Sequence, residues 1–294
     1  MSAAPRWAAV VVNYEAGPLL LDSVRSLLAD ASADGPPPVV VVDNGSTDDS
    51  LAVLRAALPA VAVVETGRNL GYAAAANRGI ARTETPIVAV CNADVRVRPG
   101  AGAALVTRFD AEPDLGAVGP AIVEPDGTRY PSARRVASVA DAVGHGTLVR
   151  VWPGNPFTRR YRQLDADPDR ARDVEWVSGA AVWLRRAAVD AVDGWDERYF
   201  MYVEDVDLCW RLRRDGWRVS FEPAATVVHV QGVSTARHPY RMIAAHHRSL
   251  LRFAACRGRG WRRALLGPAA VYLAVRAGCA MLARAVQPRA DRAN

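Results

Sequence analysis

The sequence predicts an α/β fold in which a mostly parallel sheet is flanked by helices, with a basic helical tail at its C-terminal end. Short apolar runs at residues 8–13, 39–43 and 87–92 have the length and the valine content of buried strands. Segments with apolar residues at helical spacing separate these runs, and strands that alternate with helices form parallel sheets covered on both faces. Arginine is concentrated after residue 237, which sets the tail apart.

The first hundred residues carry the clearest elements. The segments expected between the first and the last of these strands are a helix over 19–29, a helix over 50–58, a strand over 61–65, and a loop at 69–77 that runs into a helix. In open α/β sheets, ligands bind at the carboxyl ends of the strands. Asn13, Asp43 and Asn92 all fall at such ends, which makes them candidates for a binding site.

Beyond residue 100 the pattern is weaker. A helix is expected over 101–111, followed by strands over 117–123, 174–184, 217–221 and 226–230 and by helices from residue 241 onward. Residues 124–175 are rich in Arg, Pro and Asp and are expected to be irregular. Long segments without regular structure commonly form lids or binding loops.

Charge divides the chain into two predicted domains, a globular domain over 1–236 and a basic helical extension over 237–294. The first holds 25 Arg and 30 acidic residues, the second holds 12 Arg and one acid, and the chain has no Lys. Their net charges are therefore −5 and +11. Such an extension indicates an anionic partner: a membrane surface, a pyrophosphate lipid or a nucleic acid.

Residues 264–286 in this extension are rich in Ala, Leu and Val. They carry Arg276 and Arg284 and are interrupted by Gly267-Pro268, which argues against a membrane-spanning helix. The composition suits a helix that lies in the membrane interface with its arginines at the headgroups. The alternative is a C-terminal helix packed on the first domain with its arginines in water.

The cysteines and the N-terminal segment indicate a compartment. Cys91, Cys209, Cys256 and Cys279 are far apart, which argues against a disulfide framework and fits a reducing environment. Asn13 interrupts the first apolar run early, so this run is not the core of a signal peptide. We therefore expect a cytoplasmic protein, bound peripherally at the cytoplasmic face of the cell membrane.

Polar residues after two of the strands predict a nucleotide site. Asp43 opens the turn Asp-Asn-Gly-Ser, and a carboxylate at a strand end can accept a hydrogen bond from a base or a sugar hydroxyl. An Asx turn that caps the next helix is the alternative. Asn69, Gly71 and Asn77 lie on a loop that enters a helix. An asparagine inside a helix is unusual, so Asn77 either faces a ligand or braces neighbouring loops.

The segment Asn92-Ala-Asp94 predicts a cation site. Mg²⁺ and Mn²⁺ favour one or two carboxylates together with substrate phosphates. His229, on a later predicted strand, is a candidate nitrogen ligand. A turn at Asn92 and Asp94, and a core role for His229, are the alternatives.

Glu204 and Asp205 follow an aromatic stretch and open a segment with leucines at helical spacing. Acidic residues in the first turn of a helix interact favourably with its dipole, which is one explanation for the pair. A catalytic carboxylate is the other explanation.

These residues occur in a recognisable order. The motifs are Asn13-Tyr14, Val42-Asp-Asn-Gly-Ser-Thr-Asp48, Asn69-Leu-Gly-Tyr with Asn77, Asn92-Ala-Asp94, Gly194-Trp-Asp-Glu-Arg-Tyr-Phe200, Glu204-Asp-Val-Asp-Leu208 and His229-Val-Gln-Gly-Val-Ser234. In this combination the chain, over about residues 7–236, resembles family 2 glycosyltransferases, and most closely their bacterial rhamnosyltransferase-like branch.

The resemblance implies a GT-A fold and inverting transfer of a sugar from a nucleoside-diphosphate donor, dTDP-L-rhamnose, to a hydroxyl of a lipid-linked or polysaccharide acceptor in cell-envelope glycan synthesis. Asp205 is the implied base, with Glu204 as the second candidate. Asp94 and His229 are the implied ligands of Mg²⁺ or Mn²⁺. Contacts to the nucleotide-sugar are implied for Asn13, Asp43, Asn69, Gly71, Asn77 and Asn92. Residues 124–175 and 177–180 are expected to shape the acceptor site.

One departure from the family pattern leaves a second function open. Asn92 stands where the Asp-x-Asp metal motif has its first acid, which would suit a catalytically impaired nucleotide-sugar-binding protein. A nucleic-acid binder that acts through the Arg-rich tail is a further alternative. The tail's aromatic residues are not interleaved with its arginines as a base-stacking surface requires, so no nucleic-acid partner is expected.

Overall fold

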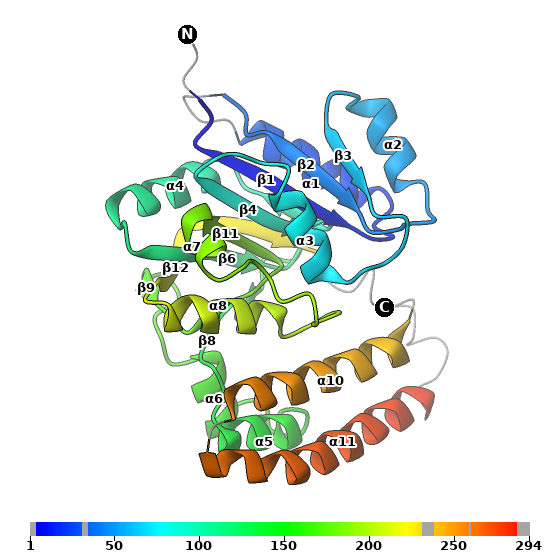
Figure 1. The fold of residues 1–294 in the computed structure, drawn as a ribbon, viewed down its shortest axis with the longest axis vertical. Coiled ribbons are helices and arrows are strands. Elements are labelled where there is room, and N and C mark those ends of the chain that lie inside the picture. The colour runs from blue at the N-terminus through cyan, green and yellow to red at the C-terminus, as the bar shows by residue number, and fades with distance from the viewer. Residues whose placement is uncertain (1–3, 31–34, 231–237, 259, 287–294) are drawn as a thin grey trace.

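The computed structural model describes residues 4–30, 35–230, 238–258 and 260–286 (Figure 1). Within them a ten-stranded sheet has the order β3-β2-β1-β4-β11-β6-β12-β5, with β7 (Arg129–Tyr130) and β9 (Arg172–Asp173) paired alongside. The eight main strands are β1 (Trp7–Asn13), β2 (Val39–Asp43), β3 (Ala62–Glu65), β4 (Ile87–Asn92), β5 (Val95–Val97), β6 (Leu115–Val123), β11 (Ala181–Arg185) and β12 (Arg218–His229). The first four are parallel, and β12 is parallel to β6. The predicted α/β fold with a mostly parallel sheet is confirmed.

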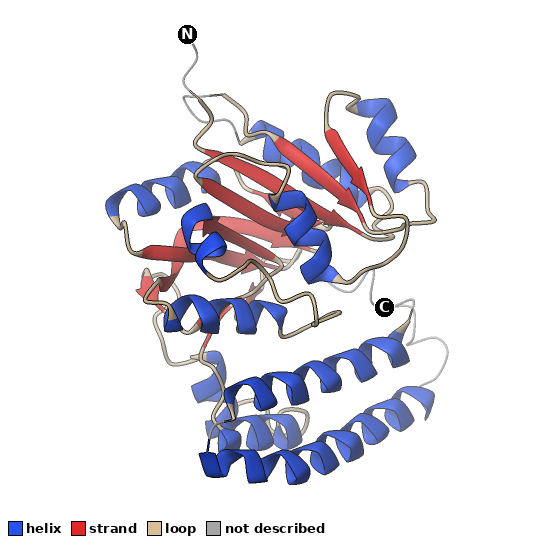
Figure 2. Cartoon of the chain, viewed as in Figure 1, coloured by secondary structure: helices blue, strands red, loops and turns tan. Residues whose placement is uncertain are grey.

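Helices cover both faces of this sheet (Figure 2). On one face lie α1 (Leu19–Ala29), α2 (Ser50–Ala57) and α4 (Ala101–Ala111), and on the other lie α3 (Tyr72–Ile80), α7 (Arg186–Ala191) and α8 (Glu204–Arg214). Ala9 and Val11 of β1 pack in the first core, and Val10 and Val12 pack in the second. Because successive side chains of a strand point to opposite faces, the uninterrupted apolar run of β1 fills both cores.

Two predicted strand regions are built differently. The 174–184 run divides into β10 (Trp176–Val177) and β11, because β10 pairs with β8 (Ala133–Arg134) in a separate two-stranded sheet. The runs at 217–221 and 226–230 join into the single strand β12. It pairs with β6 on both sides of a register shift between Glu222 and Thr226. Such an irregularity adds residues to one strand of a pair without ending it.

The 124–175 segment is not irregular throughout, contrary to the prediction. Its elements are β7 (Arg129–Tyr130), β8 (Ala133–Arg134), α5 (Val139–Leu148), α6 (Pro156–Arg162) and β9 (Arg172–Asp173). The Ser138 side chain accepts a hydrogen bond from the amide of Asp141, and that of Asn155 accepts one from Thr158. Both are ordinary N-cap arrangements. Proline at the start of α6 is also typical of a helix N-terminus.

The C-terminal part forms α10 (Pro239–Arg257), a 3₁₀ helix (Gly260–Leu265) and α11 (Leu266–Val286). The expected interruption at Gly267-Pro268 falls in the first turn of α11, where proline is tolerated because no hydrogen bond is lost. Figure 1 shows α5, α10 and α11 as one layer below α8. The predicted domain boundary at 236/237 lies outside the described residues. Phe253 of α10 is buried against Tyr199 and Val203, which belong to the predicted first domain.

Candidate active site

A cavity of about 1480 Å³ lies between the carboxyl ends of the strands and the layer formed by α5, α10 and α11. Of the ten predicted site residues, six line it: Asn69, Asn92, Asp94, Glu204, Asp205 and His229. The structure therefore brings together the candidate base and the candidate metal ligands. The four that are not among the lining residues are Asn13, Asp43, Gly71 and Asn77.

Asn13 and Asp43 form a buried hydrogen-bonded pair at adjacent strand ends. Asn13 Nδ2 donates to Asp43 Oδ1 at 2.8 Å and to Ser50 Oγ at 3.0 Å. The other carboxylate oxygen, Asp43 Oδ2, accepts from the amide of Ser46 at 3.1 Å. Asp43 is only 4% exposed. The pair thus fixes the turn after β2, and this geometry fits the Asx-turn alternative.

Asn44, which the sequence prediction did not single out, lines the cavity and holds the neighbouring loop. Its amide nitrogen donates to Asn69 Oδ1 and to the carbonyl of Gly71, both at 3.2 Å, and its oxygen accepts from Leu70 N at 2.9 Å. All of these contacts bind the 69–71 loop to the end of β2. Asn44 is a polar residue in a turn that the sequence predicted, so it could have been identified as a candidate site residue from the sequence alone.

Gly71 allows this loop to approach the segment that precedes Glu204. Its φ is +93°, and a Cβ built there would lie 2.4 Å from the carbonyl oxygen of Phe200. The amide of Tyr72 donates to that same oxygen at 3.0 Å. Only glycine meets both the positive φ and the close backbone contact.

Replacement of Gly71 by alanine is expected to lower the free energy of unfolding by about 2 kcal/mol or more, because strain at φ and a backbone clash add together. Urea denaturation measures the change. Gly127→Ala is the matched control, since Gly127 has a φ of +88° with open space around its Cβ position. Equal losses in the two variants would contradict a role for the Phe200 contact.

Asn77 braces the loop between α7 and α8. Its Nδ2 donates to the carbonyl of Trp195 at 2.9 Å and to Glu197 Oε1 at 3.0 Å, and its Oδ1 accepts from Trp195 N at 2.9 Å. The amide is thereby fully engaged within the protein. This geometry favours the bracing alternative over contact with a ligand.

Asp94 and His229 face each other across the pairing of β5 with β12. His229 Nε2 lies 3.1 Å from Asp94 Oδ1 and 3.4 Å from Asn92 Nδ2. The described residues include no group of three or more His, Cys, Asp and Glu side chains that could hold a metal. One carboxylate and one imidazole nevertheless fit a Mg²⁺ or Mn²⁺ ion that takes its remaining ligands from a diphosphate and water.

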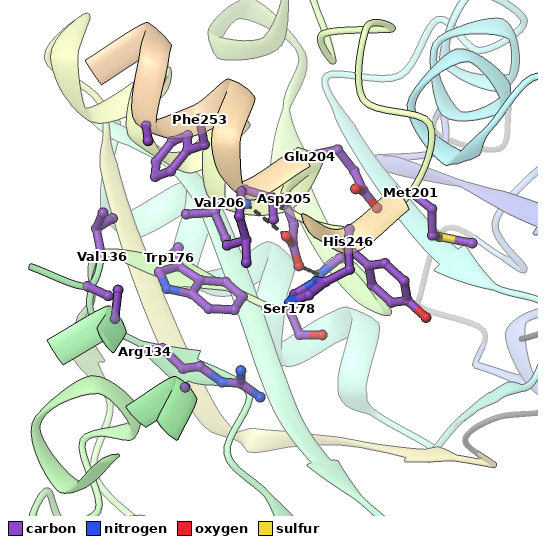
Figure 3. Close-up of a pocket in the computed structure, with 18 of the residues that line it drawn as sticks. Arg134, Val136, Trp176, Ser178, Met201, Glu204, Asp205, Val206, His246 and Phe253 are labelled. Atoms are coloured by element: carbon purple, nitrogen blue, oxygen red, sulfur yellow. Dashed lines mark hydrogen bonds between the residues drawn. The ribbon is translucent and has the colours of Figure 1, made fainter. Parts of the chain in front are cut away.

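Asp205 points into the cavity at the start of α8, near Ser178 and Trp176 (Figure 3). Its Oδ2 accepts from the amide of Gly179 at 2.9 Å, and its Oδ1 accepts from Val206 N at 2.8 Å. Val203, directly before α8, has a φ of +71°. That conformation is strained for a β-branched residue and is characteristic of functional sites. It turns the chain so that two successive carboxylates enter the site.

The two carboxyl groups differ in their surroundings. Burial raises the pKa of Glu204 well above its usual range, and the nearby charge of Asp205 raises it further. Burial also raises the pKa of Asp205, but amide hydrogen bonds from Gly179 and Val206 and the charge of Arg134 oppose the rise. Glu204 Oε2 is buried without a hydrogen-bond partner. Asp205 is therefore the first of the pair to ionise and the better candidate for a base.

Arg134 is a site residue that the sequence did not reveal. Its guanidinium lies 5.0 Å from the ring centroids of both Tyr130 and Trp176 and 5.6 Å from that of Tyr161, and its Nε donates to a backbone carbonyl at 2.6 Å. The arginine belongs to the 124–175 segment, so its position depends on the pairing of Arg134 with Trp176, which is distant in sequence. Its charge favours the ionised form of Asp205.

The solved structures to which this fold is similar include GT-A glycosyltransferases. The mannosyltransferase PcManGT from Pyrobaculum calidifontis, in complex with GDP-Man and Mn²⁺, has a TM-score of 0.58 over 99% of this chain and 78% of its own, at 20% identity. S. aureus TarS 1–349 in complex with UDP has a TM-score of 0.55 over 84% of this chain and 66% of its own, at 15% identity. These likenesses concern the fold, and they confirm the predicted GT-A class.

The chain belongs to glycosyltransferase family 2, whose model "Glycosyltransferase like family 2" matches residues 5–251. The N-acetylglucosaminyl-diphospho-decaprenol L-rhamnosyltransferase of Mycobacterium tuberculosis is 41% identical over 268 residues, 87% of this chain and 86% of the relative. The rhamnosyltransferase WbbL of Escherichia coli is 41% identical over 56 residues, 19% of this chain and 21% of the relative. The predicted family and enzyme class are confirmed.

Proposed function

We propose that the chain is an inverting rhamnosyltransferase that moves L-rhamnose from dTDP-rhamnose to a hydroxyl of an N-acetylglucosamine carried on a diphospho-polyprenol, in cell-envelope glycan synthesis. The observation that carries the proposal is the placement of Asp205 and the Asp94–His229 pair on one cavity. The 41% identity to the mycobacterial enzyme supports the choice of sugar and acceptor.

Each residue has a part in a single displacement. Asp205 accepts the proton of the acceptor hydroxyl as that oxygen forms a bond to the anomeric carbon, and the bond from this carbon to the diphosphate breaks on the opposite face. Asp94 and His229 would hold the divalent cation, which supplies Lewis-acid neutralisation of the charge on the departing diphosphate. Asn44 and Asn69 line the donor side of the cavity and fix the loop there. Inversion follows because no protein nucleophile takes part.

Calorimetric titration with dTDP-, UDP- and GDP-sugars, each with and without Mn²⁺ or Mg²⁺, tests the proposed donor. The expected result is metal-dependent binding of dTDP-rhamnose in preference to the other donors. Preferential binding of a UDP- or GDP-sugar would overturn the rhamnose donor, and binding of no donor would overturn the proposed function.

As the pH is lowered, the rate of transfer is expected to begin to fall at a higher pH than it would with a base of ordinary aspartate pKa. Asp205 must be ionised to act as a base, and its raised pKa means that protonation begins above the usual value of about 4. The pH dependence of kcat/KM, measured together with donor binding at each pH, detects this. Activity that stays constant down to about pH 4 would contradict the assignment.

We further propose that the protein is peripheral at the cytoplasmic face of the membrane, with α11 lying in the interface. The segment Arg263–Val286 is long and apolar enough to cross a membrane, and only 6% of its most apolar window is buried. Its exposed side chains include Val271, Val275 and Leu282, each more than 60% exposed. The opposite side of α11 lines the cavity through Tyr272 and Arg276, which favours an interfacial over a spanning helix.

Val275→Glu is expected to weaken binding to anionic liposomes by about tenfold, because burial of a valine side chain is worth about 1.5–3 kcal/mol and is lost. Co-sedimentation measures this, and Val53→Glu on α2 is the matched control, since Val53 is also exposed. Equal binding of both variants would contradict the interfacial proposal. Release from membranes only by detergent would indicate a spanning helix instead.

A further inference from the structure

The cavity extends beyond the donor and metal residues into the layer of C-terminal helices. Its wall there is mostly apolar and includes Val139, Val143, Leu250, Phe253, Leu266 and Leu273. The total volume of about 1480 Å³ exceeds the roughly 300–1,000 Å³ of an ordinary small-molecule pocket. The cavity therefore has room for an elongated second ligand beside a nucleotide-sugar.

Among the residues that the structure describes, four arginines line the cavity, and three of them are engaged within the protein. Arg134 is held by a backbone carbonyl and three aromatic rings, Arg241 stacks on Phe200 at 4.7 Å, and Arg257 donates to a backbone carbonyl at 3.3 Å. Arg276, by contrast, has no hydrogen bond or ion pair with any residue in the described part of the chain. It is the arginine that is available to a ligand.

Arg276 lies on the inner side of α11, one turn after Tyr272. A Cβ built at Gly146 of α5 would lie 2.8 Å from Tyr272 Oη and 3.2 Å from Arg276 Nε. The absence of a side chain at Gly146 therefore lets this side of α11 pack close to α5. Neither α10 nor α11 contains an acidic residue. A guanidinium that faces an apolar cavity without a carboxylate partner favours an anionic ligand, and phosphate suits its fork of donors.

Arg276 is close enough to His246 for its charge to act on that side chain, and both residues line the cavity that Asp205 enters. Figure 3 shows His246, which comes from α10, and Asp205 among the side chains that line one cavity. Burial lowers the pKa of His246 to about 4, and the charges of His247 and Arg276 contribute to the same shift. His246 is therefore neutral at physiological pH, and the positive charge next to it comes from Arg276. Because Arg276 and Asp205 line one cavity, an acceptor whose anionic group contacts Arg276 lies in the same cavity as the candidate base.

We infer that Arg276 binds the diphosphate of a polyprenyl-diphosphate-linked acceptor, while the apolar wall of α5, α10 and α11 holds the first isoprene units. This inference rests on the proposed function for its acceptor. It gives the C-terminal helices a direct part in substrate binding, because the lipid would leave the cavity along the helix whose outer side is exposed and apolar.

The test compares Arg276→Gln with Arg248→Gln, an exposed arginine on α10 that does not line the cavity. Calorimetry with farnesyl diphosphate as the probe measures binding without any sugar transfer. We expect Arg276→Gln to weaken binding by about tenfold or more, Arg276→Lys to restore part of it, and Arg248→Gln to change it little. Equal affinity of wild type and Arg276→Gln, or no binding to wild type, would overturn the inference.

Transfer kinetics separate this inference from the proposed function. With a short-chain prenyl-diphosphate N-acetylglucosamine acceptor, Arg276→Gln is expected to raise the acceptor KM by about tenfold or more and leave kcat and the donor KM near wild type. With an alkyl N-acetylglucosaminide, which lacks the diphosphate, the two enzymes should behave alike. An active Arg276→Gln variant with an unchanged acceptor KM would overturn the role of Arg276 and leave the proposed function intact. No transfer by wild type would overturn the proposed function, and farnesyl diphosphate binding would still decide Arg276.

Discussion

Replacement of Asp205 by asparagine is expected to reduce kcat by about 10²- to 10⁴-fold, the usual contribution of a general base, while the Kd of the donor changes little. The amide preserves the size of the side chain, and its oxygen can still accept from Gly179 N or Val206 N. It cannot take up the acceptor proton. Turnover under saturating donor and acceptor, with donor Kd from calorimetry, gives both quantities.

Glu204→Gln is the matched control for this variant. Glu204 adjoins Asp205, but one of its carboxylate oxygens is buried without a hydrogen-bond partner. Burial raises the pKa of Glu204 well above its usual range. A neutral amide should therefore be tolerated there with a smaller loss of turnover. If Asp205→Asn retained wild-type turnover while Glu204→Gln lost it, the base would be Glu204.

Replacement of Asp94 by alanine is expected to weaken metal-dependent donor binding by about a hundredfold or more. Loss of groups that merely support a metal ligand costs about 10- to 100-fold in metal affinity, and Asp94 would be a direct ligand. The variant also leaves His229 without the carboxylate that lies 3.1 Å from it. Titration of donor into wild type and variant, with Mn²⁺ and then with a chelator, measures the effect.

Asp126→Ala serves as the control, because Asp126 is an exposed loop carboxylate. It should bind donor and metal like wild type. Donor binding by Asp94→Ala that remains as tight and as dependent on metal as in wild type would contradict the metal site. The assignment would then move away from the β4–β5 turn.

The sequence predicted the first half of the fold well because its signals are local. Valine-rich runs such as residues 39–43 are apolar on both faces and end in polar residues, so a strand and its carboxyl end can be located together. The separation of β10 from β11 could not be predicted in this way. It depends on the pairing of Trp176 with Arg134, which are distant in sequence.

The candidate site shows the same division. Asp94 and Asp205 follow or begin elements with clear local patterns, and the resemblance supplied their order. Arg134 and Arg276 could not be identified from the sequence as residues that line the cavity. Their positions depend on the packing of the 124–175 segment and α11 around it. Asn77 illustrates the opposite case, since its unusual place inside a helix was noticed, but only the loop it contacts favours a bracing role.

The most direct test of the central claim is a transfer reaction with dTDP-rhamnose and a short-chain prenyl-diphosphate N-acetylglucosamine, with the product analysed by mass spectrometry and NMR. The account predicts the addition of one deoxyhexose, with an anomeric configuration opposite to that of the donor, in wild type and not in Asp205→Asn. A product that retains the donor's configuration, or no product from an enzyme that binds the donor, would contradict it.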